Sequence, residues 1–300
     1  MSTPRQIPIS VVIPVKNEEK NLPRCLARLS RFAEIIVVDS SSTDRTPEIA
    51  SEFGARYINF DWDGRYPKKR NWILINHQLD NEWVLFLDAD ELLDASVCDA
   101  LDAATRQTDC SGYWLNYTNY FLGKPLRHGI PQQKLAFFRV GKGLYEKIDE
   151  AAWSPLDMEI HEHPIIDGDL GEIPERIDHD DYRGLAKFIE RHKDYALWEA
   201  NRYQTLKSAG ADTPARLTKR QRFKYRHIAS WWYPAFYFAY TYFVRLGCLD
   251  GKAGFAYAFY KFWYFYTIRL LIAEITSPSA HPQEKSAAAS LADQALTPKS

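Results

Sequence analysis

Three carboxylates stand close together in the stretch EWVLFLDADE, directly after a run of apolar residues. Residues 83–87 are apolar and β-prone, which favours a buried strand. Asp88, Asp90 and Glu91 follow this run. Because like charges this close repel one another, a cation is expected beside them. An Asp-x-Asp pair after a buried strand suits Mg²⁺ or Mn²⁺, which take oxygen ligands and bridge to substrate phosphates.

Polar side chains also follow two other predicted strands. The β-branched runs in residues 9–15 and 34–44 predict strands buried in the same sheet. In a mostly parallel sheet, ligands bind beyond the carboxyl ends of the strands. Asp and Ser also favour turns and helix caps, which explains Asp44 equally well. The polar residues at these two strand ends are Asn17, Glu18, Asp39, Ser41 and Asp44.

Helical segments alternate with the predicted strands. Residues 17–32, 46–54 and 68–79 have helical spacing, and Thr46 is the expected N-cap of the second segment. Residues 55–60 form another short strand. Strands and helices that alternate in short units predict a mostly parallel sheet with right-handed crossovers.

The fold class predicted from this alternation is therefore α/β, with helices flanking the sheet. Aromatic stretches broken by Gly and Pro in residues 112–150 predict antiparallel strands that extend the sheet. Residues 184–210 predict a long amphipathic helix.

Charge, cysteine content and missing motifs exclude several classes of protein. The 300 residues carry a formal net charge of −1, so the chain has no general attraction to nucleic acid. Its four cysteines are widely spread and form no CxxC pair, which indicates a reducing compartment. The sequence has no Walker-type phosphate loop, no GxGxxG fingerprint and no apolar secretory signal at its start.

Four segments, VVIPVKNEE, IIVVDSSSTDRT, KKRNW and FLDADE, resemble in this order the family 2 glycosyltransferases with a GT-A fold. Two later segments, HEHPIIDGDLGEIPERIDHDDY and YFVRLGCLDGKAGFAYAFYKFWYFY, resemble a narrower group. This group contains bacterial lipopolysaccharide inner-core glucosyltransferases and related envelope-polysaccharide enzymes. The resemblance implies an inverting transferase that moves a sugar such as glucose from a UDP-sugar to a lipid-linked saccharide. It also implies Mg²⁺ or Mn²⁺ as cofactor.

The resemblance assigns roles to individual residues. Asp39 would accept a hydrogen bond from the nucleotide base, and Lys69 and Arg70 would lie near the pyrophosphate, where cations suit the phosphates. Asp90 would ligate the metal directly, and Asp88 would contact the ribose or the metal. The residues expected to bind the nucleotide-sugar are Pro14, Asn17, Glu18, Asp39, Ser41, Lys69, Arg70 and Asp88.

An inverting transfer needs a general base that deprotonates the acceptor hydroxyl, whereas the diphosphate leaves without a protein acid. Glu162, next to His161, is the first candidate for this base, and Asp149 is the second. His179 is a candidate third ligand of the metal or a contact of the diphosphate. Zinc bound by these histidines and His163 is an alternative, although their spacing matches no standard zinc site.

The last third of the chain joins a basic run to aromatic segments. Residues 216–226 contain six Lys or Arg and no acid, and residues 227–244 contain no Asp, Glu, Lys or Arg. Residues 254–275 are aromatic but are interrupted by Lys261 and Arg269. The pattern predicts a helical hairpin in the membrane interface, with the basic run facing anionic headgroups. A helical pair packed on protein or in a dimer interface, and a two-pass membrane anchor, stay open as alternatives.

The sequence therefore predicts a catalytic domain in residues 1–205, a basic and aromatic helical extension in 206–276 and a disordered tail in 277–300. The predicted partners are a UDP-sugar, a lipid-linked saccharide and an anionic membrane surface; a homo-oligomer stays open. The predicted location is peripheral, on the cytoplasmic face of the inner membrane. Two other functions stay open: a polyprenyl-phosphate glycosyltransferase, whose acceptor needs no strong base, and a non-catalytic nucleotide-binding membrane scaffold.

Overall fold

The chain divides into two compact units in a computed structural model. The first unit runs to Ile189 and also takes Tyr240–Ala258, and the second takes Glu190–Ala239 and the residues from Phe259. The predicted domain boundary after residue 205 falls inside helix α5 (Gly184–Ser208) and stays a prediction. The structure describes residues 5–148, 150, 153–154, 156–159, 163–181, 183–208 and 217–277, so the predicted tail lies almost wholly outside it.

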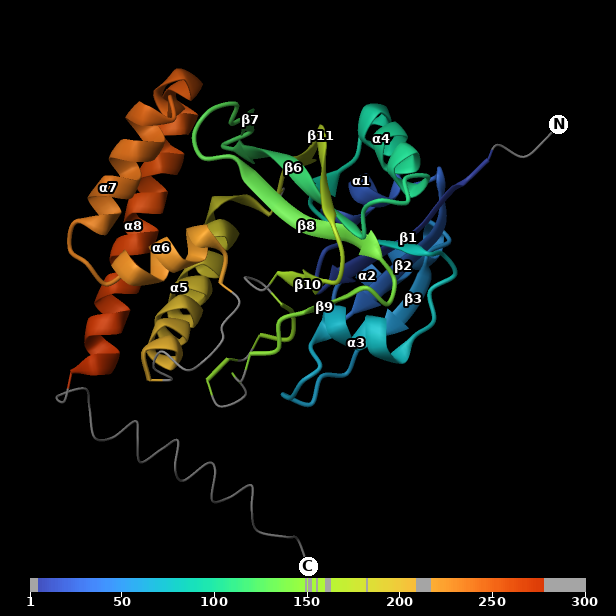
Figure 1. Cartoon of the computed structure of the whole chain (residues 1–300), viewed down its shortest axis with the longest axis horizontal. Helices are drawn as coiled ribbons and strands as arrows, with labels where there is room; N and C mark the ends of the chain where they lie inside the picture. Colours follow the sequence, from blue (N-terminus) through green and yellow to red (C-terminus); the bar gives the residue numbers. More distant parts are fainter. Residues whose placement is uncertain are drawn as a thin grey trace, which may run out of the picture. The chain divides into compact units, whose positions relative to one another are not determined.

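A nine-stranded sheet, counted over the described residues, forms the centre of the first unit (Figure 1). Its parallel part has the order β3-β2-β1-β4, and β1 pairs in parallel with both β2 and β4. These strands are predicted correctly. Strands β1, β2 and β4 are apolar runs that are largely buried in the sheet, whereas β3 lies at its edge and is mostly exposed. Their bounds are Ile7–Val15 (β1), Phe32–Asp39 (β2), Arg56–Asn59 (β3) and Trp83–Phe86 (β4).

Antiparallel strands extend the sheet on the far side of β4, as the aromatic stretches predicted. Strand β8 pairs antiparallel with β4 and with β6, and β11 returns parallel to β6. The short strand β5 pairs antiparallel with β11 and closes that edge. The bounds are Glu91–Leu92 (β5), Gly112–Phe121 (β6), Lys124–Pro125 (β7), Gln132–Arg139 (β8) and Leu170–His179 (β11); β9 (Gly143–Tyr145) and β10 (Pro164–Ile166) form a separate pair.

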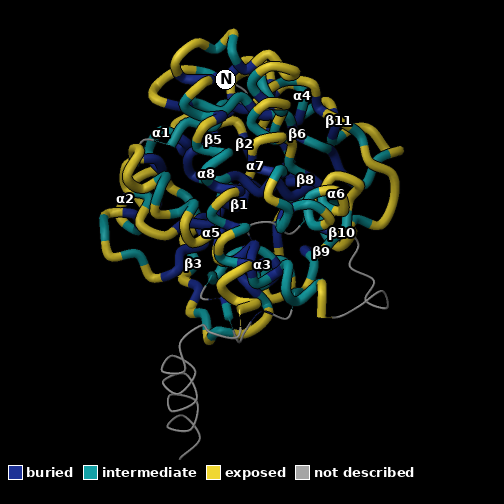
Figure 2. Tube along the Cα trace, turned by 90° about the vertical axis from the view of Figure 1, so that its left-hand side faces the viewer, coloured by how far each residue is buried: buried dark blue, intermediate teal, exposed yellow. Residues whose placement is uncertain are grey.

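Within the described residues, four helices alternate with strands β1 to β6, and the buried residues of the unit concentrate on its strands (Figure 2). Helix α2 begins at Thr46, so the prediction of Thr46 as N-cap is wrong. Its hydroxyl instead accepts the N–H of Glu18 at 2.8 Å, which ties the helix to the loop after β1. Asp44 accepts the N–H of Thr46 at 3.0 Å. The bounds are Leu22–Leu26 (α1), Thr46–Glu52 (α2), Lys69–Asn76 (α3) and Ala95–Thr105 (α4).

The second unit is helical, and its core is aromatic. Tyr233 packs edge-on against Phe265 with ring centroids 5.2 Å apart, and Ile228 and Ile268 are buried beside them. Helix α6 begins with a capping box between Thr218 and Gln221. The helices of this unit include α6 (Lys219–His227), α7 (Tyr233–Ala239) and most of α8 (Gly251–Thr276). The π-helical turn at Tyr240–Val244 and the 3₁₀ turn at Gly247–Asp250 belong to the first unit.

None of the helices in the described ranges is both long enough and apolar enough to cross a membrane.

Candidate active site

The loops after β1 and β2 are tied together by hydrogen bonds. The N–H of Asn17 donates to the hydroxyl of Ser42 at 2.7 Å, and the Asn17 amide oxygen accepts the N–H of Thr43 at 2.8 Å. Asn17 and Ser41 both have positive φ, at 56° and 53°, so each loop turns sharply away from its strand. Pro14 is buried near the end of β1. The two strand ends thus present their polar residues at one edge of the sheet.

Asp39 is fully buried at the last position of β2. Its carboxylate accepts the N–H of Ser42 at 3.1 Å, the Ser42 hydroxyl at 2.6 Å and the hydroxyl of Tyr57 at 2.8 Å. Burial and this contact with Asp39 raise the pKa of Tyr57 to about 12. These bonds fix the Asp39 carboxylate at the strand end, where a base-binding residue was predicted.

Lys69 starts helix α3, and its side chain is buried beneath the end of β1. The ammonium donates to the carbonyl of Val15 at 2.8 Å and lies 3.3 Å from the carboxylate of Asp157. Burial lowers the pKa of Lys69, and Asp157 opposes this effect. Asp157 also accepts a hydrogen bond from Ser40, just after β2. Lys69 therefore joins two strand ends to the segment around residue 157.

Arg70 connects the start of α3 to the acid cluster after β4, which consists of Asp88, Asp90 and Glu91. One guanidinium nitrogen lies 2.7 Å from Asp88, and the guanidinium stacks over the ring of Tyr145, 5.4 Å from its centroid. The buried carboxylate of Glu159 accepts the N–H of Arg70 at 3.0 Å and that of Asn71 at 3.1 Å. Glu159 thus caps α3 from a distant part of the sequence, since Lys68 offers no side-chain cap.

Basic side chains neutralise two members of this acid cluster, Asp88 and Glu91. Lys134 on β8 lies 2.6 Å from Asp88 and also pairs with Glu91, which is 1% exposed. Burial raises the pKa of Asp88, but Lys134 and Arg70 outweigh it and hold that pKa well below its usual range. Among the described residues, the cations expected beside these acids are thus partly supplied by the protein itself.

Asp90 faces a histidine on the neighbouring strand. The Nε2 of His179, the last residue of β11, lies 3.4 Å from Asp90, and its Nδ1 lies 3.0 Å from the amide oxygen of Asn119. Because an amide oxygen only accepts, this contact favours the tautomer with the proton on Nδ1. Burial lowers the pKa of His179, but the Asp90 carboxylate outweighs it and the pKa is raised. The ring is thereby held with Nε2 towards Asp90.

His179 and Asp90 together form the histidine site. Arg183, just after β11, links the loop after β1 to this site. Its guanidinium pairs with Glu18, and one nitrogen lies 3.8 Å from Asp90. Asp181 holds the same guanidinium at 2.8 Å. Burial raises the pKa of Glu18 to about 7, although Arg183 acts in the opposite direction. Glu18 is therefore packed beside the acid cluster.

Asp90 and His179 supply the donor types that Mg²⁺ or Mn²⁺ accepts, a carboxylate and an imidazole. A His that ligates metal through one ring nitrogen usually donates its other N–H to a neighbouring oxygen, as His179 does to Asn119. Across the ranges that the structure describes, no group of three or more His, Cys, Asp or Glu is arranged to hold a metal ion. The pair fits a cation that takes its other ligands from water and substrate phosphates.

The predicted general bases, Glu162 and Asp149, lie outside the described residues, as does His161. The structure does describe His163, whose ring centroid lies 5.7 Å from that of Trp114. Ser41 lies at the surface, where its hydroxyl donates to Asp61 at 3.1 Å.

Lys134, Arg183 and Asn119 are site residues that the sequence analysis missed. Strand β8 pairs antiparallel with β4, with Leu85 opposite Phe137. Continued to the end of β4, this register places Lys134 opposite Asp88. Finding Lys134 from the sequence would have required the strand order, because Lys134 and Asp88 are 46 positions apart in the sequence.

Residues 10–152 match the family model described as Glycosyl transferase family 2. The lipopolysaccharide core biosynthesis glycosyltransferase LpsC of Rhizobium meliloti is 28% identical over 269 residues, which are 85% of this chain and 90% of that protein. The 4,4'-diaponeurosporenoate glycosyltransferase of Staphylococcus haemolyticus is 34% identical over 131 residues, covering 40% of this chain and 34% of that protein.

Two solved structures are also similar to this chain. The structure of S. aureus TarS 1–349 has a TM-score of 0.42 at 14% identity and covers 89% of this chain and 90% of its own. Glucosyl-3-phosphoglycerate synthase from Mycobacterium tuberculosis, solved with Mn²⁺, UDP and glucosyl-3-phosphoglycerate, has a TM-score of 0.31 at 24% identity and covers 40% of this chain and 45% of its own. The chain therefore contains a glycosyl transferase family 2 domain, carried by residues 10–152, and is similar to LpsC over most of its length.

Proposed function

We propose that this protein moves a hexose, glucose or a near relative, from a UDP-sugar to a lipid-linked saccharide such as a lipopolysaccharide core. The observation that carries the proposal is the convergence of Asp39, Asp88 and Asp90 at the carboxyl ends of β2 and β4. These strands belong to the segment that matches the family model. Sheets of this type bind ligands at that edge. The similarity to LpsC over most of both chains supports an envelope saccharide as acceptor.

The described residues divide the work of the donor site. Asp90 and His179 would hold the divalent cation, which when bound would neutralise charge on the departing diphosphate. Arg70 and Lys134 keep the Asp88 carboxylate charged and fixed in place. Such a fixed carboxylate can accept hydrogen bonds from ribose hydroxyls without reorganising.

Calorimetric titration of UDP tests the donor half of the proposal. We expect the native chain to bind UDP with Mn²⁺ and to lose most of this binding in EDTA and in Asp90→Ala. Asp99→Ala is the matched control, because Asp99 is an exposed aspartate that pairs with Arg31 at the surface. UDP binding that is equally tight with EDTA and in Asp90→Ala would refute the metal site. An absence of UDP binding in the native chain would refute the donor.

For the acceptor half, we propose Glu162 as the general base of an inverting transfer, with Asp149 as the second candidate. Removing a general base lowers turnover by about 10²- to 10⁴-fold. We expect Glu162→Gln to show such a loss while its UDP affinity stays unchanged. Near-normal turnover would instead favour a polyprenyl-phosphate acceptor, because a phosphate needs no strong base. Any measured sugar transfer would rule out the non-catalytic scaffold.

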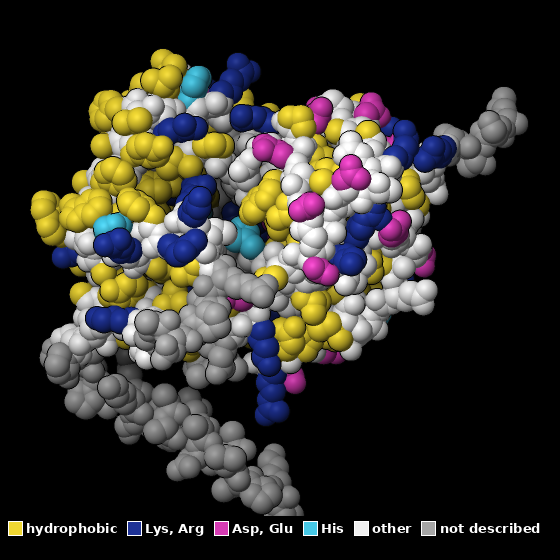
Figure 3. Space-filling model, viewed as in Figure 1, with side chains coloured by type: hydrophobic (Ala, Val, Ile, Leu, Met, Phe, Trp, Pro, Cys, Tyr) yellow, Lys and Arg dark blue, Asp and Glu magenta, His cyan; other side chains and the backbone are white. Residues whose placement is uncertain are grey.

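We also propose that the protein lies on the cytoplasmic face of the inner membrane. Hydrophobic side chains gather on the surface of α7 and α8 (Figure 3). Trp231 is 78% exposed, and Phe259 is 52% exposed. Helix α6 has no buried residue and ends in Lys224, Arg226 and His227. Exposed aromatic surface and basic charge in one unit suit an anionic bilayer.

A further inference from the structure

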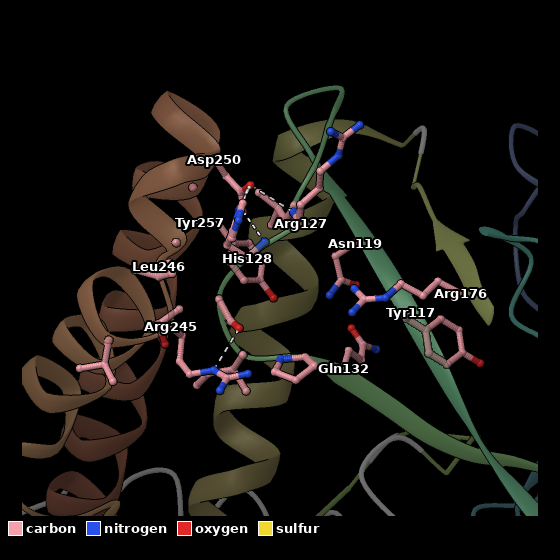
Figure 4. Close-up of a pocket in the computed structure, with 18 residues that line it drawn as sticks. Tyr117, Asn119, Arg127, His128, Gln132, Arg176, Arg245, Leu246, Asp250 and Tyr257 are labelled. Atoms are coloured by element: carbon pink, nitrogen blue, oxygen red, sulfur yellow. Dashed lines mark hydrogen bonds and ion pairs between the residues drawn. The ribbon is translucent and has the colours of Figure 1, made fainter. Parts of the chain in front are cut away.

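A cavity of about 310 Å³ lies in the first unit, next to the histidine site. Tyr117 and Asn119 of β6 and Arg176 of β11 form one wall. The loop from Leu126 to Gln132 and the turn from Thr241 to Gly247 form the others. Figure 4 shows Arg176 and Asn119 on one side of this cavity and Arg245 on another. Neither the family match nor the donor site accounts for it.

Asn119 joins the cavity to the donor site. Its amide oxygen is occupied by Nδ1 of His179 at 3.0 Å. Because the oxygen and the NH₂ point in different directions from the same carbon, the amide nitrogen is left to donate elsewhere. Asn119 also lines the cavity. A molecule in the cavity therefore lies one side chain away from the His179–Asp90 pair.

The lining of the cavity is cationic. It contains Arg127, Arg176 and Arg245, and its single acid is Asp250. Asp250 is already occupied, because its carboxylate accepts the N–H groups of Arg127 and His128 and lies 2.9 Å from the His128 ring. Within the described ranges, no carboxylate forms an ion pair with the guanidinium of Arg176 or Arg245. The net charge therefore favours an anionic occupant.

The guanidiniums suit one kind of anion in particular. A guanidinium presents paired N–H donors that match the oxygens of a phosphate or carboxylate. Arg176 and Arg245 are both exposed to solvent, so a ligand can reach them. The rim beside Arg245 is apolar, since Val244 and Leu246 are 66% and 49% exposed. A saccharide with an anionic group and a lipid attached matches both features.

We propose that this cavity binds a phosphate or carboxylate group of the acceptor saccharide. Arg176 and Arg245 hold that group and thereby direct an acceptor hydroxyl towards the donor site. The inference rests on the proposed transferase function and adds the class of acceptor to it, namely an anionic saccharide. The two arginines are positioning and binding residues, and neither takes part in the chemistry.

Titration of glucose 6-phosphate and of inorganic phosphate tests the cavity directly, with neutral glucose as the control ligand. We expect both phosphates to bind the native chain, with and without saturating UDP, and to bind Arg176→Gln/Arg245→Gln at least tenfold more weakly. Arg31→Gln is the matched control, because Arg31 pairs with Asp99 at the surface. Replacing these two exposed arginines leaves the core unchanged. An unchanged melting temperature verifies that the double variant is folded.

Equal binding to the native chain and the double variant, or no binding to either, would overturn the proposal. Binding of vesicles with phosphatidic acid that the double variant loses, without binding of glucose 6-phosphate, would also overturn it and assign the cavity to lipid headgroups. Titration of citrate in place of phosphate shows whether the cavity binds carboxylates as well as phosphates. If UDP fails to bind while the phosphates bind and the double variant loses them, the donor proposal fails and the anion site stands.

Discussion

At the residue scale, Lys134 neutralises two acids at once. It contacts Asp88 and the almost fully buried Glu91. Lys134→Met keeps the length of the stem but leaves two carboxylates without their shared cation. Breaking a buried ion pair in this way costs about 3–5 kcal/mol. We expect a loss of this size in urea unfolding at neutral pH.

Lys142→Met is the matched control for that prediction. Lys142 is half exposed and lies 3.8 Å from an exposed carboxylate of Asp167. Surface pairs of this kind contribute about 0–1 kcal/mol. If the two lysine variants lose the same stability, Lys134 does not neutralise the cluster.

Also at the residue scale, Asn119 orients His179. Asn119→Leu removes the oxygen that holds Nδ1 while keeping a similar volume. Loss of such a partner typically weakens metal binding about 10- to 100-fold. We expect Mn²⁺-dependent UDP affinity to fall by this factor in Asn119→Leu, measured by calorimetry. In Asn116→Leu the fall should be absent, because Asn116 bonds to Glu172 and Ile173 instead. An unchanged affinity in Asn119→Leu would show that His179 needs no such support.

At the element scale, helix α3 depends on a cap from a distant segment. Glu159 accepts two N–H groups at the start of the helix and is 1% exposed. Glu159→Ala leaves both donors unsatisfied, at a cost of about 1–3 kcal/mol each. Asp94→Ala, at the start of α4, removes one cap bond to Val97 and should cost about 1 kcal/mol. Urea unfolding of both variants measures the difference, and equal losses would contradict the capping role.

Three strands of the parallel half, β1, β2 and β4, could be predicted from the sequence because they are largely buried on both faces. A run such as ISVVIPV then contains almost only apolar residues. The partners of Asp88 could not be predicted, because they depend on which strand pairs with β4 and in what register. The Thr46 prediction was wrong for a related reason. Its hydroxyl bonds to Glu18, a contact between segments rather than within the helix.

At the scale of the whole molecule, low pH should weaken the contacts that Asp157 makes with Lys69 and Ser40 near the ends of β1 and β2. Burial raises the pKa of Asp157, but Lys69 and Ser40 outweigh it and the pKa is lowered. A carboxylate with a lowered folded-state pKa stabilises the protein above its unfolded pKa, and this contribution is lost as the pH falls through the folded value. The stability gap between the native chain and Asp157→Asn should therefore be full at pH 7. It should shrink as the pH falls below about 4.

Urea unfolding of both proteins from pH 7 to pH 3 measures this gap. The difference between the two proteins is the informative quantity, because burial raises the pKa of Glu18 and Glu159 and these groups act in the opposite direction. A gap that stays constant over the whole range would show that Asp157 has the same pKa in the folded and unfolded chains.

The membrane proposal also belongs to the whole molecule, because attraction to a bilayer sums over many side chains. Each Lys or Arg near an anionic surface contributes about 1 kcal/mol, and salt screens this attraction. The aromatic contribution is not screened, because it comes from burying apolar area. We therefore expect flotation with anionic vesicles to weaken in Arg220→Gln/Arg222→Gln/Arg226→Gln and in high salt. Trp231→Ser should weaken the part of the binding that survives high salt.

Neutral vesicles and Arg31→Gln are the controls for this experiment. Neutral vesicles remove the charge attraction but keep the apolar one, so the native chain should bind them weakly and without salt dependence. If the native chain does not float with anionic vesicles at low salt, the aromatic surface of α7 and α8 meets protein instead. The helices would then form an interface with another chain, and sedimentation would show an assembly larger than the monomer.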